Sequence, residues 1–386
     1  AKRRFDSDAV FVEASHKAVV GLQGGDPASV AVWQRIVDQW RSHYQPVYDA
    51  LGVGLSARDE RGESFYNPML ADVVRDLQAL GLARESDGAI CVFPEGFKTK
   101  EGEPLPFIVR KSDGAFLYAT TDLAAIRYRV GELAADRIVY VTDSRQKLHF
   151  EMLFATARAA GWALAPVELV HVMFGSVLGE DGTPLKTRSG ESVKLKALLE
   201  EAVDRARAVV DQKNPDLPED NKAQIARAVG IGAVKYADYS NNRTSDYVFS
   251  FDRMLAMDGN TAPYMQYAYA RVRSIGRKAK DKGVDVQAEL ARADQARLDE
   301  QDELALAKHL IRYSEAVEGA LADYRPNILT AYLYDLAQRF SSFYNNCPVL
   351  DAGRDKRPAR LLLCDLTART IRHGLGLLGI SVVEEM

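Results

Sequence analysis

The feature that most constrains the fold is a change of apolar periodicity between residues 107 and 173. Short apolar runs of strand length alternate there with segments whose apolar residues recur at helical spacing. The runs expected to be strands are 115–118, 138–141 and 167–173. Strands separated by helices at this spacing are typical of a parallel sheet with crossover helices. The sequence therefore predicts an α/β unit in the middle of the chain.

Both flanks of this unit are expected to be mainly helical. Before it, helical stripes run through 26–51 and 67–80, and Asp26 is a suitable N-cap for the first. Closer to the unit, an Asp-Gly turn at 113–114 predicts a hairpin between the runs 107–110 and 115–118. After it, stripes recur at 304–321, 328–344 and 359–378. The last 130 residues are therefore predicted to form an all-α bundle.

Composition excludes several classes of protein. With 47% hydrophobic residues and a formal net charge of −4, the 386 residues do not resemble a disordered chain. No run approaches the roughly 18 apolar residues of a membrane span, and no apolar segment follows the first residues as in a signal peptide. Three scattered cysteines argue against a disulfide scaffold. We therefore expect a cytoplasmic protein with no membrane partner.

Polar side chains gather after the predicted strands, where open parallel sheets bind ligands. Tyr118 and Asp122 follow the first apolar run, and Gln146 and His149 follow the second. A carboxylate beside a tyrosine hydroxyl and an amide would suit a guanidinium group, which a carboxylate binds bidentately. The alternative is that Asp122 only caps its own helix, which we expect to begin at Thr120 or Thr121.

A second candidate is the glycine-flanked loop that follows the third strand. Lys186 and Arg188 lie in this loop, and they indicate either a phosphate site or a solvated turn. The sequence has no Gly-x-x-x-x-Gly-Lys-Ser/Thr loop and no Gly-x-Gly-x-x-Gly. The six histidines include no pair at metal-ligand spacing, so we expect no metal site.

A third candidate is the helix expected after Thr261. Tyr264, Tyr267 and Arg271 share one face of it, and a basic run continues to residue 282. Aromatic rings beside arginines suit RNA, because each stacked base contributes roughly 1–3 kcal/mol. The alternative is that the tyrosines are buried against another helix and the charges form a solvated face.

The chain resembles the arginyl-tRNA synthetase family, most closely its bacterial branch. The stretches that carry the resemblance follow in order along essentially the whole chain: 116–124 (FLYATTDLA), 143–146 (DSRQ), 171–175 (HVMFG), 186–190 (KTRSG), 232–238 (GAVKYAD), 242–244 (NRT) and 258–268 (DGNTAPYMQYA). The resemblance implies an α/β plus all-α fold. Residues 1–255 would be part of a class I synthetase Rossmann-like nucleotide-binding domain with helical insertions, and residues 256–386 an α-helical anticodon-binding bundle.

The same resemblance implies a function and a set of site residues. The family activates arginine with ATP and Mg²⁺, forms arginyl-adenylate and transfers the arginine to its tRNA, usually as a monomer without a tightly bound cofactor. The implied arginine-binding residues are Tyr118, Asp122 and Gln146. The implied ATP-binding residues are His149, His171, Met173, Phe174 and Gly175. The implied tRNA-binding residues are Tyr264, Tyr267, Arg271, Tyr344 and Met386.

Two departures from the family pattern qualify these expectations. The family's Lys-Met-Ser-Lys-Ser loop is represented by Pro184-Leu185-Lys186-Thr187-Arg188, which leaves Lys186 and Arg188 as the expected catalytic phosphate ligands. The family's His-x-Gly-His motif is absent from the sequence. We therefore expect the carboxyl-terminal two-thirds of such an enzyme, inactive by itself. The alternative is a non-catalytic tRNA-binding module or fragment.

Overall fold

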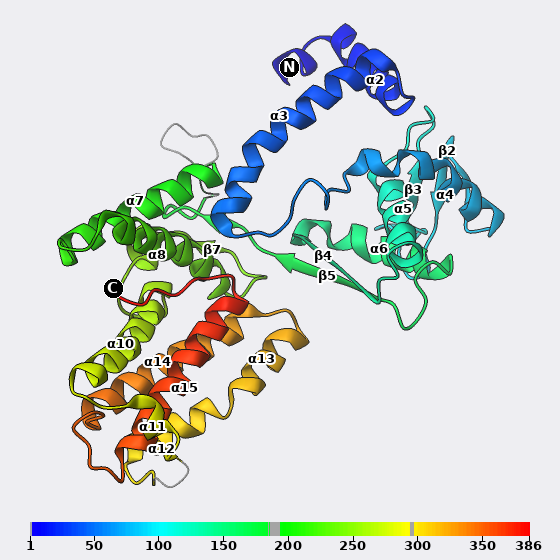
Figure 1. Cartoon of the computed structure of the whole chain (residues 1–386). Helices are drawn as coiled ribbons and strands as arrows, with labels where there is room; N and C mark the ends of the chain where they lie inside the picture. Colours follow the sequence, from blue (N-terminus) through cyan, green and yellow to red (C-terminus); the bar gives the residue numbers. More distant parts are fainter. Residues whose placement is uncertain (1, 184, 186–193, 294–296) are drawn as a thin grey trace. The chain divides into compact units, whose positions relative to one another are not determined.

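The computed structural model describes residues 2–183, 185, 194–293 and 297–386, and the chain divides into two compact units (Figure 1). The first unit extends to Phe174, apart from Ala50–Gly52. The second unit comprises Ala50–Gly52 and Gly175–Met386.

The first unit begins with three helices, of which the third is the longest. They are α1 (Lys2–Phe5), α2 (Ala9–Gln23) and α3 (Pro27–Leu51), whose last residues belong to the second unit. The predicted N-cap of α3 is confirmed, because the backbone N–H of Ser29 donates to Asp26 Oδ2 at 2.8 Å. Pro27 stands at the first helical position, where its missing N–H removes no helical hydrogen bond.

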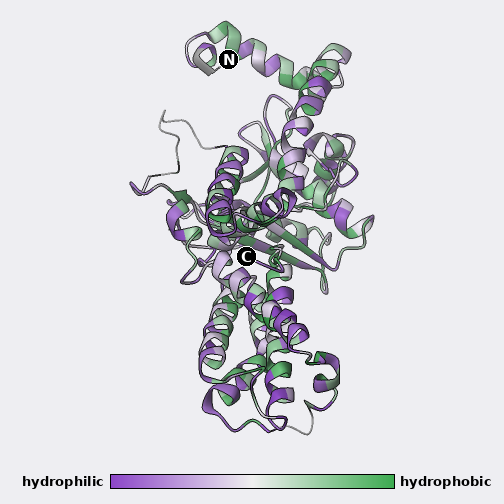
Figure 2. Ribbon diagram, turned by 60° about the vertical axis from the view of Figure 1, so that its left-hand side comes forward, coloured by the Kyte–Doolittle hydropathy of each residue, from purple (hydrophilic) through white to green (hydrophobic). Residues whose placement is uncertain are grey.

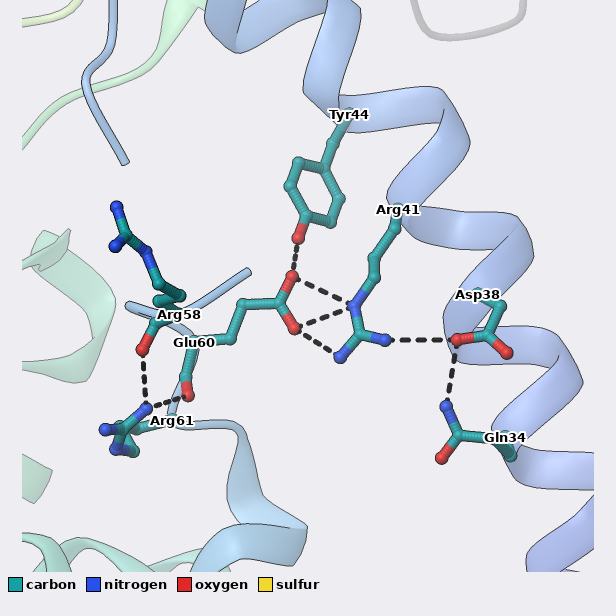
Figure 3. A network of polar contacts seen from close by, with 7 residues as sticks. All are labelled: Gln34, Asp38, Arg41, Tyr44, Arg58, Glu60 and Arg61. Atoms are coloured by element: carbon teal, nitrogen blue, oxygen red, sulfur yellow. Dashed lines mark hydrogen bonds and ion pairs between the residues drawn. The ribbon is translucent and has the colours of Figure 1, made fainter. Parts of the chain in front are cut away.

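A polar network joins α3 to the segment that follows it (Figure 3). Glu60 accepts hydrogen bonds from the hydroxyl of Tyr44 and from the guanidinium of Arg41, with Nη2 at 2.6 Å. The same guanidinium donates to Asp38 Oδ1 at 3.0 Å. Because an arginine fork matches a carboxylate in geometry, these contacts hold the loop at Glu60 against the second half of α3.

The rest of the first unit contains two small sheets and the helices that pack against them. An antiparallel sheet has the order β1 (Ala83–Ser86), β2 (Ala89–Val92), β3 (Phe107–Arg110). A parallel sheet pairs β4 (Arg137–Asp143) with β5 (Glu168–Phe174), in register from Arg137 opposite Glu168 to Asp143 opposite Phe174. The helical segments are η1 (Glu63–Tyr66), α4 (Asn67–Ala79), α5 (Tyr118–Gly131), η2 (Ser144–Gln146) and α6 (Lys147–Ala159).

The predicted strand 115–118 is wrong, and the predicted hairpin is reduced to one bridge. Phe116 pairs with Arg110 in a single antiparallel bridge, and α5 already begins at Tyr118. Leu117 is extended and caps the helix, because its carbonyl accepts from the N–H groups of Thr120 and Thr121 at 3.0 and 3.2 Å. Within the described residues the parallel sheet therefore has two strands.

One apolar core holds the first unit together. Its fully buried side chains include Leu77 of α4, Leu123 and Ile126 of α5, and Leu153 of α6. Burying one such side chain contributes roughly 1.5–3 kcal/mol. This packing fixes α5 and α6 side by side, and these two helices carry the side chains of the first candidate site.

The second unit is mainly helical. Two short parallel strands, β6 (Val177–Leu178) and β7 (Tyr247–Val248), accompany α7 (Leu195–Lys213), α8 (Glu219–Tyr239) and α9 (Phe251–Met254). The bundle that follows consists of α10 (Ala262–Asp281), α11 (Val286–Leu290), α12 (Gln301–Leu310), α13 (Tyr313–Ala322), α14 (Pro326–Asn346) and α15 (Arg357–Leu377). The all-α prediction for this region is thus confirmed, although the stripe 304–321 is divided between two helices.

The bundle helices are amphipathic, with hydrophobic and hydrophilic residues on each (Figure 2). Their shared core contains Met265, Leu333, Phe340, Phe343 and Ile371, all essentially inaccessible to solvent. Thr261 caps α10 as predicted, because its hydroxyl accepts from the N–H of Tyr264 at 3.3 Å. Among the described helices, none is long and apolar enough to cross a membrane.

Candidate functional site

A carboxylate and an imidazole meet where α5 and α6 lie side by side. Asp122 Oδ2 lies 2.7 Å from His149 Nε2, and the ring of Tyr118 lies 4.9 Å from the imidazole, centroid to centroid. Tyr118 and Asp122 lie in the first two turns of α5, and His149 lies in the first turn of α6. The structure therefore brings together three of the predicted residues, which come from two segments of the chain.

This site is partly open to solvent. The side chains of His149 and Asp122 are 14% and 31% exposed, and Tyr118 is 63% exposed. A carboxylate in such a position is half desolvated, which strengthens its attraction for a cation compared with bulk water. Tyr118 is thus mostly exposed beside a carboxylate that is mostly buried.

The alternative role for Asp122, capping its own helix, is wrong. Because α5 begins at Tyr118, Asp122 lies in its second turn, and no acidic residue occupies the first turn. Its carboxylate contacts His149 of the neighbouring helix instead. The threonines expected as caps are also used differently, since Thr120 lies inside the helix and its hydroxyl donates to the carbonyl of Val109.

Gln146 lies at the beginning of the same helix as His149. It is the last residue of η2 and the N-cap of α6, one turn before the imidazole, and it is exposed. Among the described hydrogen bonds, none joins Gln146 to Asp122. The structure thus places Gln146 on the element that carries His149, with its amide available for a further partner.

A second imidazole lies on the neighbouring strand β5. His171 Nε2 lies 2.7 Å from the hydroxyl of Thr142, which belongs to β4. The His171 ring packs 4.4 Å from the ring of Phe150, and His149 contacts the same phenylalanine at 5.1 Å. Two of the residues expected to bind ATP therefore share one aromatic neighbour.

The remaining residues expected to bind nucleotide follow at the end of β5. Met173 and Phe174 are the last residues of the strand, and Phe174 is exposed. Gly175 donates its N–H to the carbonyl of Arg243 at 2.8 Å, and a Cβ there would lie 2.7 Å from the backbone of Ser245. Glycine is thus required here by the close approach of two backbone segments. Lys186 and Arg188 lie outside the described residues.

The predicted RNA face is built mainly from α10 and α14. The guanidinium of Arg271 lies 4.1 Å from the centroid of the Tyr344 ring, and its Nη2 donates to Asn345 Oδ1 at 3.4 Å. Tyr264 is half buried, with its ring 5.9 Å from that of Tyr334. Tyr267 is 40% exposed. Tyr264 is thus half buried beside Tyr334 of α14, whereas Tyr267 is exposed, and binding of RNA by this face stays a prediction.

Met386 lies in a different neighbourhood. It packs against the apolar cluster of α7 and α8 that also contains Val383. The segment before it is held by α10, because Tyr269 and Arg273 donate to the carboxylate of Glu384 at 2.8 and 2.7 Å. The structure therefore does not join Met386 to the pair formed by Arg271 and Tyr344.

The sequence reasoning missed further polar and aromatic residues at both sites. Tyr334 and Gln338 are linked by a hydrogen bond of 2.9 Å on α14, next to Tyr264. Their spacing of four residues within a helical stripe could have revealed them. Phe150 and Thr142 of the first site carried no comparable signal, because an apolar residue and a threonine are ordinary in a helix and a strand.

Two families match the chain, one for each part of the sequence. Residues 1–251 match the family described as tRNA synthetases class I (R), catalytic domain. Residues 265–386 match the DALR anticodon binding domain.

Curated relatives and solved structures agree with this result. An arginine–tRNA ligase from Synechococcus sp. is 51% identical over the whole chain, and one from Alcanivorax borkumensis is 49% identical. The chain spans 65% of the length of each of these relatives. The arginyl-tRNA synthetase of Plasmodium falciparum superposes with a TM-score of 0.83 at 30% identity, over 100% of this chain and 66% of its own. The chain belongs to the arginyl-tRNA synthetase family, with a class I catalytic domain followed by a helical DALR domain.

Proposed function

We propose that this chain acts as part of an arginine–tRNA ligase. In this reaction arginine is activated with ATP, and the arginyl group is then transferred to the 3′ end of arginine tRNA. Membership of the family supports this proposal, and the observation that carries it is the half-buried Asp122 carboxylate beside Tyr118. A carboxylate at this position would attract a substrate with a cationic side chain such as a guanidinium.

Arginine recognition follows from the donors and acceptors present. The guanidinium offers five N–H donors in a plane, and a carboxylate accepts two of them at once. We propose that Asp122 takes this role, while the Tyr118 hydroxyl and the Gln146 amide oxygen accept further N–H groups. A hydrogen bond to a charged group contributes roughly 1.5–3 kcal/mol, which corresponds to about 10- to 150-fold in affinity.

We propose that a second group of residues binds ATP, the other substrate of the activation step. The residues that we assign to the adenosine are His171, Met173, Phe174 and the backbone of Gly175. Lys186 and Arg188 are proposed to contact the phosphates, which enter as the Mg²⁺ complex of ATP. These two cationic side chains would form charge-assisted hydrogen bonds with the negatively charged phosphate oxygens.

The helical region 256–386 is proposed to bind the anticodon of the tRNA. The match to the DALR domain supports this assignment, as do the aromatic and cationic side chains on α10 and α14. We assign Tyr267, Tyr344 and Arg271 to base contacts, with Tyr264 and Met386 as supporting contacts. A guanidinium stacked on a tyrosine already forms a planar surface of the kind that unpaired bases stack on.

The residues 1–386 by themselves are proposed not to activate arginine. The sequence lacks His-x-Gly-His, which the resemblance implies for the nucleotide site, and the relatives that match are about half as long again. We further propose that the protein works in the cytoplasm and as a monomer. A tRNA-binding module without catalytic activity is the second candidate, and the missing motif is the observation that favours it.

Titration calorimetry with arginine and with citrulline tests the proposed amino-acid site. Citrulline keeps the shape of arginine but replaces the charged guanidinium by a neutral ureido group. We expect arginine to bind the chain at least tenfold more tightly than citrulline, and Asp122→Asn to remove this preference. Glu151→Gln, which neutralises an exposed carboxylate on α6, is the control and should leave the preference intact. Equal binding of both amino acids to the wild-type chain would refute the assignment.

A further inference from the structure

Asp122 and His149 form a short hydrogen bond inside the proposed arginine site. His149 Nε2 lies 2.7 Å from Asp122 Oδ2, which is the length of a charge-assisted hydrogen bond. An ionised carboxylate can only accept, so the proton of this bond must reside on Nε2 of the imidazole. The other carboxylate oxygen, Oδ1, has no hydrogen-bond partner among the described residues.

Aromatic side chains fix the orientation of the imidazole. The rings of Tyr118, Phe150 and Phe107 have their centroids 4.9, 5.1 and 5.7 Å from that of His149. The contact with Phe150 is edge to face, with an interplanar angle of 78°. With three rings around it and a side chain only 14% exposed, the imidazole has little freedom to turn away from Asp122.

We infer that His149 is a positioning residue for the arginine site. Its Nε2–H holds one oxygen of the Asp122 carboxylate, so that the other oxygen and the remaining lone pairs face the incoming guanidinium. This inference rests on the proposed function, because it takes Asp122 as the arginine ligand. It changes the role implied by the family resemblance, in which His149 lies near the adenosine of ATP.

The hydrogen bond between His149 Nε2 and Asp122 argues against a direct contact between His149 and the adenosine. Nε2 is occupied by Asp122, so this nitrogen is not free to contact a nucleotide while the pair is formed. Three aromatic rings surround the imidazole at tilted or edge-on angles, and its side chain is only 14% exposed, which leaves little room for a purine beside it. We therefore assign the His149 side chain to the Asp122 carboxylate rather than to the adenosine of ATP.

Two amide substitutions separate the positioning role from a merely structural one. The side-chain nitrogen of glutamine reaches the place of the imidazole Nε2, whereas that of asparagine reaches only the place of Nδ1. His149→Gln therefore keeps the donor to Asp122, and His149→Asn loses it. We expect the arginine dissociation constant to rise about tenfold in His149→Asn and His149→Ala, and to stay within about threefold of wild type in His149→Gln.

The test combines calorimetry with nuclear magnetic resonance of the ¹⁵N-labelled histidines. Calorimetry measures arginine and citrulline on the full chain and on the three variants, and thermal melting confirms that each variant is folded. The inference predicts weaker arginine binding and a smaller arginine preference in the asparagine and alanine variants, with rescue by glutamine. Unchanged arginine affinity in the folded His149→Ala variant would overturn it, and so would equal losses in the glutamine and asparagine variants.

The spectra of the histidine rings test the hydrogen bond without any ligand. In the wild-type chain the Nε2 of His149 should be protonated, and its resonance should shift in Asp122→Asn. A resonance indifferent to that substitution would overturn the inference even if a His149 variant failed to fold. Wild-type protein that binds no arginine would instead refute the proposed function, and with it the inference that rests upon it.

Discussion

Glu303 and Arg360 form a buried ion pair that connects two helices of the bundle, and Glu303→Gln should destabilise this region. Arg360 Nε donates to Glu303 Oε1 at 2.6 Å, and the two side chains are 6% and 0% exposed. Glu303 Oε2 also accepts the backbone N–H groups of Asp299 and Glu300 at 2.9 and 3.0 Å, which completes a capping box at the start of α12.

The size of the effect follows from what the substitution leaves behind. Breaking a buried ion pair by removing one partner costs roughly 3–5 kcal/mol, because the other charge stays buried without compensation. Glutamine keeps one oxygen as an acceptor, and Arg360 keeps its hydrogen bond to the carbonyl of Pro348 at 2.7 Å and the Glu300 carboxylate 4.0 Å away. We therefore expect the lower end of that range, about 3 kcal/mol, or a factor of more than about 100 in the opening equilibrium.

Hydrogen exchange measured by mass spectrometry is the suitable assay, because a chain of two units need not unfold in a single step. Peptides from α12 and α15 should exchange faster in Glu303→Gln by about this factor. The three tryptophans, Trp33, Trp40 and Trp162, all lie in the first unit, so their fluorescence reports on that unit and hydrogen exchange is needed for the bundle. Glu315→Gln, an exposed partner of Arg312, is the control. Equal protection of α12 and α15 in both variants would show that the Glu303–Arg360 pair does not stabilise the bundle.

The same pair makes stability depend on pH. Burial raises the pKa of Glu303, but hydrogen bonds from the Glu300 N–H, the Arg360 guanidinium and the Asp299 N–H outweigh it, so that the pKa is lowered overall. A lowered pKa in the folded state stabilises the protein above the ordinary glutamate value, about 4.3, and this contribution is lost as the pH falls through the lowered value. The difference in free energy of unfolding between wild type and Glu303→Gln should therefore be largest at pH 7 and become smaller below about pH 4.

Two further predictions concern packing and RNA. Gly230→Ala places a Cβ 2.7 Å from the backbone of Val203 and should lower the melting temperature, whereas Gly276→Ala meets nothing within 4 Å on α10 and should raise it slightly, by about 0.5–1 kcal/mol of stability. Equal shifts in both alanine variants would contradict the close contact of α7 with α8. Arg271→Ala removes the cation above Tyr344 and should weaken tRNA binding about tenfold in a filter assay, with a smaller preference for the cognate anticodon. Unchanged affinity together with an unchanged anticodon preference would place the RNA elsewhere.

Local patterns predicted the long helices of the bundle and the parallel strands of the first unit, but not the strands β1 and β2 or the helix α2. The stripe 67–80 became α4 (Asn67–Ala79), and the run 167–173 became β5 (Glu168–Phe174). Periodicity succeeds here because each element buries one face or both within its own unit. The prediction of a strand at 115–118 was wrong because Leu117 is the N-cap of α5, which begins at the next residue, Tyr118. The backbone hydrogen bonds of the helix determine this boundary, and the side-chain pattern does not reveal it.

The candidate site could be predicted as a set of residues but not as a set of contacts. Tyr118 and Asp122 were named because polar residues follow the run 115–118, although that run is not a strand and both residues lie on α5. The hydrogen bond between Asp122 and His149 joins residues 27 positions apart on two helices, and it depends on how α5 and α6 pack. The separation of Met386 from Tyr344 likewise depends on the path of the last residues along α10.

Filter binding of this chain to arginine tRNA, beside variants of the anticodon and at two salt concentrations, tests whether residues 256–386 bind the anticodon. We expect binding that weakens when the anticodon is changed, and also when the salt concentration is raised, because cationic side chains contact the phosphates. Binding that is absent, or that is equally strong for every anticodon, would contradict this expectation.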